Sequence, residues 1–198
     1  MRAVARIYNL KFKAKEGFIL SEEDMKRNRT FFVTSMRDPM ERVVSSYFFE
    51  GLWPDDTPEH NRTMESARSL EDYIDFVTAR PLRWKVWLCV SDCFTKWYGT
   101  SKVVGNMIRG YDLDTAKERL KRHHMIVRTE SMKQPDYWER IMYLLGAENI
   151  NLTQQGGIYN PGVYNPKNYT HLVSADAMKR LEDINRNDYE LMDCLLEK

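Results

Sequence analysis

Arg37 and Ser45 are the side chains in this sequence whose types and spacing best suit the binding of an anion. A guanidinium can hold a phosphate through two parallel hydrogen bonds, and a serine hydroxyl on a neighbouring helix can add another. The alternative is that Arg37 pairs with a carboxylate while Ser45 only faces polar surroundings. Residue types and spacing leave both interpretations open.

A strand followed directly by a helix must position these two side chains. Phe31 to Arg37 is rich in aromatic and β-branched residues, which predicts a buried strand. Asp38 is a preferred N-cap and Pro39 suits the first helical position, so a helix is predicted to begin at Pro39. Arg37 would then lie at the carboxyl edge of a parallel sheet, where open α/β folds bind their ligands. The apolar face of this helix comprises Met40, Val43, Val44, Tyr47 and Phe48.

The same segment resembles the signature R-D-P-x-x-R-x-x-S-x-Y of Golgi-type carbohydrate sulfotransferases, the family of the heparan sulfate-modifying enzymes. Arg37-Asp38-Pro39, Arg42, Ser45 and Tyr47 match it. In that family the strand and helix bind the 3′-phosphate of the donor PAPS (3′-phosphoadenosine 5′-phosphosulfate), so the resemblance assigns this phosphate to Arg37 and Ser45. Arg42 is interpreted as a structural or ion-pairing residue. The implied activity is transfer of a sulfuryl group from PAPS to a hydroxyl of a glycan or polysaccharide acceptor, with no metal.

A second unit of the chain resembles the later core of the same family. Leu113 to Leu120 is a predicted helix, and Met125-Ile126-Val127 is a short buried strand that follows it closely. So short a link is typical of an α/β crossover, and we expect the strand to lie parallel in the sheet. Glu130 and Leu144-Leu145-Gly146 continue the resemblance.

Three further segments are predicted from local signals. Ser69 begins a helix that ends at Pro81, Leu82 to Tyr98 forms another, and Ser174 begins a long C-terminal helix. Asp188 falls on the apolar stripe of this last helix and is expected to pair with a buried partner. Asn151 to Thr170 is predicted to be a long loop, with Lys167 as its only cation. Cys89 and Cys93 are interpreted as small core residues, and His123-His124 as a helix end.

Two functional parts of the family have no counterpart upstream of the signature. A phosphosulfate-binding loop of the P-K-x-G-[ST]-[ST] kind does not occur in residues 1–36. Lys96-Trp97-Tyr98-Gly99-Thr100-Ser101 has a similar order of residue types, but its lysine-to-glycine spacing is too long and it follows a helical run. The family's catalytic base, a Glu or His, also lies upstream, and no residue of this chain is assigned to that role.

Composition limits the function further. The chain has 198 residues and a net charge of +1, which gives no general attraction to nucleic acid or to a membrane surface. No apolar run approaches the length of a membrane-spanning helix. Four glycosylation sequons, at Asn28, Asn61, Asn151 and Asn168, favour a lumenal protein. The resemblance implies the Golgi lumen or membrane, with a membrane anchor in the full-length form.

These observations predict one α/β domain over residues 1–198, with a parallel sheet flanked by helices and a P-loop-like sulfotransferase fold. Residues 1–30 would be an irregular N-terminal arm, and the fold would be incomplete at its N-terminus because the phosphosulfate loop is missing. An alternative is a truncated or degenerate relative that binds PAP, PAPS or glycan without turnover. A third interpretation is an α-rich interaction module that binds no nucleotide.

Overall fold

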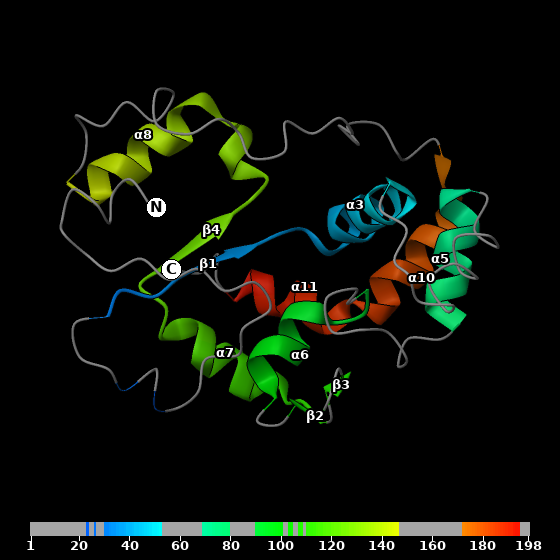
Figure 1. The fold of residues 1–198 in the computed structure, drawn as a ribbon, viewed down its shortest axis with the longest axis horizontal. Coiled ribbons are helices and arrows are strands. Elements are labelled where there is room, and N and C mark those ends of the chain that lie inside the picture. Colours follow the sequence, from blue (N-terminus) through cyan, green and yellow to red (C-terminus); the bar gives the residue numbers. More distant parts are fainter. Residues whose placement is uncertain are drawn as a thin grey trace.

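The computed structural model describes residues 30–52, 69–79, 90–100, 103–104, 107–108, 110–146 and 172–194, together with Glu23 and Lys26. Within these residues the fold is mostly helical and contains a two-stranded parallel sheet (Figure 1). The α/β prediction is therefore confirmed at this coarse level. The predicted N-terminal arm and the predicted loop from Asn151 to Thr170, including Lys167, lie outside the described residues.

The parallel sheet joins two segments that are far apart in sequence. Strand β1 (Val33–Met36) pairs with β4 (Met125–Arg128), in a register that sets Met36 opposite Arg128. The pairing continues beyond β1, because the Thr129 amide donates to the Met36 carbonyl at 2.9 Å. The predicted parallel strand is confirmed, and β1 ends one residue earlier than expected, which leaves Arg37 in the turn that follows.

Helix α3 (Pro39–Leu52) begins at the predicted residue. The Asp38 carboxylate accepts a hydrogen bond from the Glu41 amide at 3.0 Å, and the Asp38 carbonyl accepts from the Arg42 amide at 2.9 Å. These contacts satisfy first-turn amides that a helix cannot pair internally, which is the role predicted for Asp38 as N-cap.

One hydrophobic core lies between α3, α5 (Leu70–Ala79) and α10 (Ala175–Ile184), which gather at one side of the molecule in Figure 1. Both partner helices start at the predicted caps: the Ser69 hydroxyl accepts from the Asp72 amide at 3.1 Å, and the Ser174 hydroxyl accepts from the Ala177 amide at 3.2 Å. The buried members of this core are Met40, Val43, Val44, Leu70, Tyr73, Ile74, Val77, Val90, Val173, Ala177 and Leu181.

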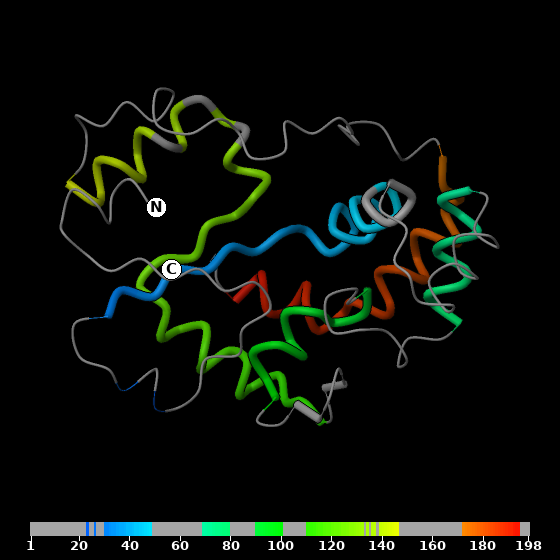
Figure 2. Tube along the Cα trace, in the orientation of Figure 1, coloured from blue at the N-terminus to red at the C-terminus, as the bar shows by residue number. Residues whose placement is uncertain are grey.

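A second core joins the sheet to α6 (Cys93–Gly99), α7 (Leu113–Lys121) and α11 (Arg186–Asp193). Figure 2 traces the chain from β1 directly into α3, with α11 below this junction. The predicted α7 helix is confirmed, and His123-His124 follow its end as expected. The buried members are Met36, Ala116, Leu120, Leu191 and Met192.

Helices α6 and α7 pack so closely that glycine is required at their contact. A Cβ atom added to Gly99 would overlap the backbone carbonyl oxygen of Asp112, the N-cap of α7. Cys93, at the start of α6, is buried as predicted, whereas Cys89 lies outside the described residues. The remaining elements are β2 (Val103–Val104), antiparallel to β3 (Met107–Ile108), then η2 (Ser131–Lys133) and α8 (Pro135–Leu144) after β4.

The prediction of one continuous helix from Leu82 to Tyr98 is wrong in its second half. Asp92 has φ 43°, the left-handed conformation, and α6 begins only at Cys93. An aspartate adopts this conformation only where local bonds stabilise it, and the Asp92 amide donates to the Asn185 side chain at 3.0 Å. The predicted helical residues before Val90 lie outside the described part of the chain.

The predicted single C-terminal helix is also wrong, because it is divided at Asn185. The Asn185 side-chain amide donates to the carbonyls of Val90 and Leu181, each at 2.9 Å, while its own backbone has φ −117° and ψ 16°. Helix α10 therefore ends at Ile184 and α11 begins at Arg186. These two bonds serve a buried amide that would otherwise carry a desolvation cost.

Candidate functional site

The turn between β1 and α3 carries Arg37 and is held in place by the neighbouring strand. The Asp38 amide donates to Oε1 of Glu130 at 2.6 Å, and the Thr129 hydroxyl donates to the same oxygen at 3.0 Å. Glu130 follows the end of β4, so one carboxylate connects the carboxyl ends of both parallel strands. Arg37 thus leaves the sheet at the edge where α/β folds place their ligands.

Arg37 forms an ion pair with Glu41, one turn into α3. The Arg37 Nε atom lies 3.7 Å from Glu41 Oε2, and the two side chains are 29% and 24% exposed. A partly exposed pair at this separation contributes little stability, so an incoming phosphate could replace the carboxylate at small cost. Arg37 therefore pairs with a carboxylate in this structure, as the alternative interpretation of the sequence expected. Because the pair is weak, the anion-binding interpretation of Arg37 stays open.

Ser45 lies one further turn along the same side of α3. It is half-buried and follows Glu41 by four residues, a spacing that places side chains above one another on a helix. Arg37, Glu41 and Ser45 therefore succeed one another along the first turns of α3. This four-residue spacing puts the two predicted phosphate ligands on one side of the start of α3, with a carboxylate between them.

Arg42 extends from α3 to Asp188 on α11 and to Asn185 at its start. Its Nη1 atom donates to Oδ2 of Asp188 and its Nη2 atom donates to Oδ1 of Asn185, both at 2.9 Å. Its guanidinium carbon lies 5.1 Å from the centre of the Phe94 ring, within the range of a cation–π contact. The prediction of an ion-pairing role for Arg42 is confirmed, as is the prediction of a buried partner for Asp188.

Asp188 also caps helix α6. Its carboxylate accepts from the backbone amides of Phe94 at 3.1 Å and Thr95 at 2.7 Å, and from the Thr95 hydroxyl at 2.9 Å. The side chain is entirely inaccessible to solvent. The guanidinium of Arg42 and these donors replace the water that the buried carboxylate has lost.

Asp92 performs the reciprocal function for α11. Its carboxylate accepts from the Asn187 amide at 3.1 Å and from the Asn187 side-chain nitrogen at 2.7 Å. Burial raises the pKa of Asp92, the Asn187 bond partly opposes this, and the charge of Asp188 adds to the increase. Asp92 and Asp188 thus join the ends of α6 and α11 by buried polar contacts and serve the scaffold of the site.

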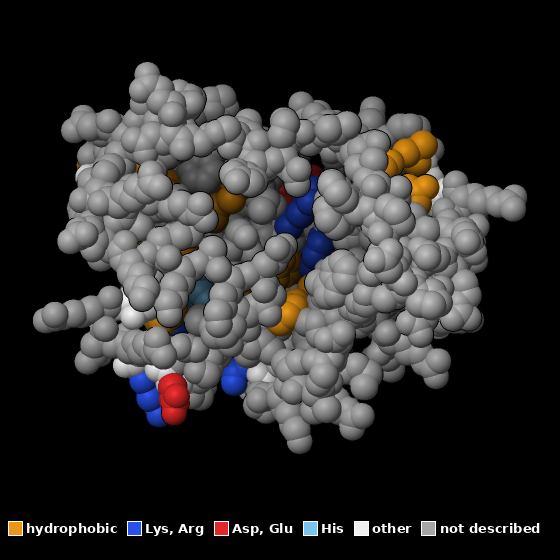
Figure 3. Space-filling model, in the orientation of Figure 1, with side chains coloured by type: hydrophobic (Ala, Val, Ile, Leu, Met, Phe, Trp, Pro, Cys, Tyr) orange, Lys and Arg blue, Asp and Glu red, His pale blue; other side chains and the backbone are white. Residues whose placement is uncertain are grey.

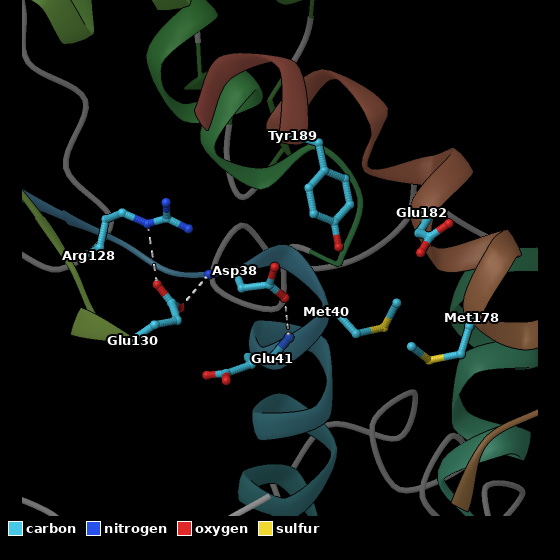
Figure 4. Close-up of a pocket in the computed structure, with 8 residues that line it drawn as sticks. All are labelled: Asp38, Met40, Glu41, Arg128, Glu130, Met178, Glu182 and Tyr189. Atoms are coloured by element: carbon cyan, nitrogen blue, oxygen red, sulfur yellow. Dashed lines mark hydrogen bonds and ion pairs between the residues drawn. The ribbon is translucent and has the colours of Figure 1, made fainter. Parts of the chain in front are cut away.

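A pocket of about 390 Å³ opens beside the β1–α3 turn (Figure 4). Figure 4 shows Arg128 and Glu130 on one side and the ends of two methionines on the other, with the Tyr189 ring pointing toward Asp38 and Met40. Arg37 and Ser45 are absent from the lining of this pocket. The lining residues are Asp38, Met40, Glu41, Arg128, Glu130, Met178, Glu182 and Tyr189.

Sequence reasoning did not identify this pocket, although two signals pointed toward it. Glu130 stands three residues after the predicted strand that ends at Val127. Met178 and Glu182 are four residues apart on a predicted helix, which places them on one face. The sequence does not reveal that α10 and α11 pack beside the sheet edge, and this contact completes the pocket.

On the face shown in Figure 3, basic side chains with acidic ones near them are visible in a depression near the centre.

The segment Lys96 to Thr100 is part of the scaffold. The Lys96 ammonium donates to the Ser91 carbonyl at 2.5 Å, and Gly99 closes against Asp112. Both contacts lie within or beside a helix, which agrees with the interpretation that this segment is not the phosphosulfate loop. Residues 1–29, where the family has that loop, lie outside the part of the chain that the structure describes, apart from Glu23 and Lys26.

The described residues show neither a metal cluster nor a membrane-spanning helix. None of their groups of His, Cys, Asp and Glu side chains could hold a metal ion. Among the described helices, none combines the length and the apolar character that crossing a membrane requires.

Comparison with known proteins provides no relative from which a function could be transferred. No protein-family model, no curated protein and no solved structure matches this chain. The functional argument therefore depends on the residues of the chain and their geometry.

Proposed function

We propose that this chain is a PAPS-dependent carbohydrate sulfotransferase domain in which Arg37 and Ser45 bind the 3′-phosphate of the donor. One observation carries the proposal: the residues of the R-D-P signature occupy a strand end, a helix cap and the first turns of that helix, in the order the signature requires. Arg37 and Ser45 lie along one side of α3, and Arg42 is committed to Asp188. These positions support the proposed roles.

The proposed reaction is an in-line displacement at sulfur. The acceptor hydroxyl oxygen forms a new bond to sulfur while the bond from sulfur to the 5′-phosphate of PAP (3′-phosphoadenosine 5′-phosphate) breaks, and the hydroxyl proton passes to a base. No described residue is assigned as that base. As in phosphoryl transfer, positioning and charge stabilisation would supply most of the rate enhancement. The contribution of Arg37 and Ser45 would be to fix the register of the donor.

A calorimetric titration with PAP tests the donor site. We expect PAP to bind and 5′-AMP, which lacks the 3′-phosphate, to bind much more weakly. Arg37→Ala should reduce PAP affinity by about tenfold or more, because it removes a charge-assisted bond to phosphate. Arg140→Ala is the matched control, since Arg140 is exposed on α8 and its loss changes the net charge equally. A folded chain that does not bind PAP would refute the proposal.

A second candidate is a non-catalytic relative that binds nucleotide or glycan without turnover. The ion pair between Arg37 and Glu41 and the lack of a phosphosulfate loop in residues 1–36 favour it. Release of PAP from PAPS in the presence of a glycan acceptor separates the two candidates. PAP binding with no acceptor-dependent release would support the non-catalytic form.

The proposal extends to location and partners. A sulfotransferase of this kind would meet its glycan acceptor in the Golgi, and this assignment depends on the resemblance and on the four sequons. Glycosylation of the secreted chain at those asparagines, detected as a mass decrease after enzymatic deglycosylation, would support a lumenal protein.

A further inference from the structure

The pocket beside the β1–α3 turn has an unusual charge balance for a protein proposed to bind an anionic donor. Its lining includes four carboxylates, from Asp38, Glu41, Glu130 and Glu182, but only the guanidinium of Arg128 as a cation. Arg128 is itself paired, with its Nε atom 3.8 Å from Glu130 Oε2. A phosphate, sulfate or carboxylate entering this pocket would meet an excess of negative charge.

The position and size of the pocket suit a ligand. It lies at the carboxyl ends of β1 and β4, and its volume of about 390 Å³ falls within the range of small-molecule sites. Elements distant in the chain form it, because the β1–α3 turn and the end of β4 contribute one side and α10 and α11 contribute the other (Figure 4). The residues that line the pocket are therefore brought together by the tertiary fold.

The walls of the pocket differ in chemistry. Met40 and Met178 direct their ends toward one another on one side, Tyr189 reaches in from α11, and the carboxylates lie around the remaining edge (Figure 4). A sugar ring has the complementary pattern, with C–H groups on its faces and hydrogen-bond donors around its rim. Carboxylates accept hydrogen bonds from hydroxyls, and from ammonium groups more strongly.

We propose that this pocket binds the acceptor sugar and that it selects a unit carrying a free amine over one carrying sulfate or carboxylate. The inference rests on the proposed function, because it assigns the pocket to the acceptor of that reaction. Glu41 is the connection between the two sites: it lines the pocket and pairs with Arg37, the proposed ligand of the donor phosphate. Donor and acceptor would thus meet at the first turn of α3.

The experiment is a calorimetric titration of the full chain with a trimer of β-1,4-linked glucosamine. Its N-acetylated form and a sulfated trimer of the same length are titrated alongside it. We expect the glucosamine trimer to bind, the acetylated trimer to bind more weakly, and the sulfated trimer to give no heat. Equal binding of the amine and sulfated trimers, or no binding of any trimer to folded protein, would overturn the inference.

Glu182 provides the matched variants, because it is exposed on α10 and lines the pocket. Glu182→Gln should weaken glucosamine-trimer binding by about tenfold, the effect of losing one charge-assisted hydrogen bond, and Glu182→Lys should weaken it further. Asp183→Asn is the control, since Asp183 is the next residue, is also exposed, and does not line the pocket. Loss of binding in the Asp183 variant equal to that in the Glu182 variants would overturn the assignment.

PAP binding measured on the same samples separates this inference from the proposed function. Glu182→Gln should leave PAP affinity unchanged, because Glu182 is on α10 and Arg37 and Ser45 are not among the residues that line the pocket. A chain that binds PAP but no glucosamine trimer overturns the inference and leaves the donor site intact. A chain that binds the trimer through Glu182 but not PAP supports an amino-sugar pocket and refutes the sulfotransferase.

Discussion

Arg42 and Asp188 form a hydrogen-bonded ion pair of 2.9 Å across a separation of 146 residues. Arg42 is 14% exposed and Asp188 is fully buried. Because Asp188 also caps α6, this pair connects the helix that carries Ser45 to the C-terminal helices and to α6. The orientation of α3, and with it the candidate anion site, is therefore set partly by residues at the other end of the chain.

Removal of either partner of this pair should be strongly destabilising. We expect Asp188→Ala and Arg42→Ala each to lower the free energy of unfolding by about 3–5 kcal/mol, because each leaves a largely buried charge without its ion-pair partner. Urea denaturation measures the change. Arg140→Ala is the control for an exposed pair, with an expected change below about 0.5 kcal/mol. An Asp188→Ala protein as stable as this control would contradict the buried ion pair.

Glu130 should stabilise the turn that carries Arg37. Its replacement by Ala leaves the part-buried Asp38 amide without its acceptor, which should lower the free energy of unfolding by about 1–3 kcal/mol. Glu130→Gln retains a side-chain oxygen and should recover most of this loss. Glu139→Ala, at an exposed position on α8, serves as the control in the same urea titrations. Equal losses in the Gln and Ala variants would show that the bond to Asp38 is not what Glu130 contributes.

Glu41 should compete with phosphate for Arg37. Glu41→Gln removes a carboxylate 3.7 Å from the guanidinium, so PAP affinity is expected to rise by about twofold to fivefold, as for loss of a weak, partly exposed ion pair. Calorimetry measures the change in PAP affinity. Asp136→Asn, on α8, is the control because it removes one negative charge at a position far along the chain. The gain should vanish when Arg37→Ala is present as well. An unchanged or lower affinity for Glu41→Gln alone would argue against competition at Arg37.

His123 should make stability depend on pH. Burial lowers the pKa of His123 below its ordinary value of 6.5, partly opposed by hydrogen bonds to the Arg119 and Leu120 carbonyls, and the neighbouring charge of His124 lowers it further. Just below pH 6.5 the unfolded chain therefore binds more protons than the folded chain, and stability should fall as the pH drops through this range. The imidazole packs edge-on against Tyr98, 5.5 Å between ring centres, which leaves little room for water.

The variant His123→Gln isolates this effect because it can still donate to the Arg119 carbonyl but does not titrate. Free energies of unfolding measured from about pH 5 to about pH 7.5 should show a smaller decrease toward acid in the variant. Identical pH dependence in the two proteins would place the acid sensitivity elsewhere.

Local signals in the sequence determined where the main elements begin. Asp38-Pro39, Ser69 and Ser174 each mark a helix start that the structure contains, because an N-cap satisfies amides within three residues of itself. The strand Met125–Arg128 and its parallel pairing followed from one short helix-to-strand link. The candidate ligands Arg37 and Ser45 were likewise predicted from the sequence, because both belong to one continuous segment.

The tertiary structure decided what these local signals could not. Helical periodicity predicts no break at Asp92 or Asn185, yet the helix is interrupted at both residues. The Asp92 amide donates to the Asn185 side chain, and the Asn185 side chain donates to the Val90 carbonyl. Buried polar groups need such partners, and the tertiary fold decides where they are found. The identity of the partner of Arg42 and the acidic lining of the pocket depend in the same way on contacts between distant segments. The sequence alone specified the helix caps and the candidate anion-binding residues because those depend on near neighbours. The charge that surrounds them depends on which distant segments the fold brings beside them.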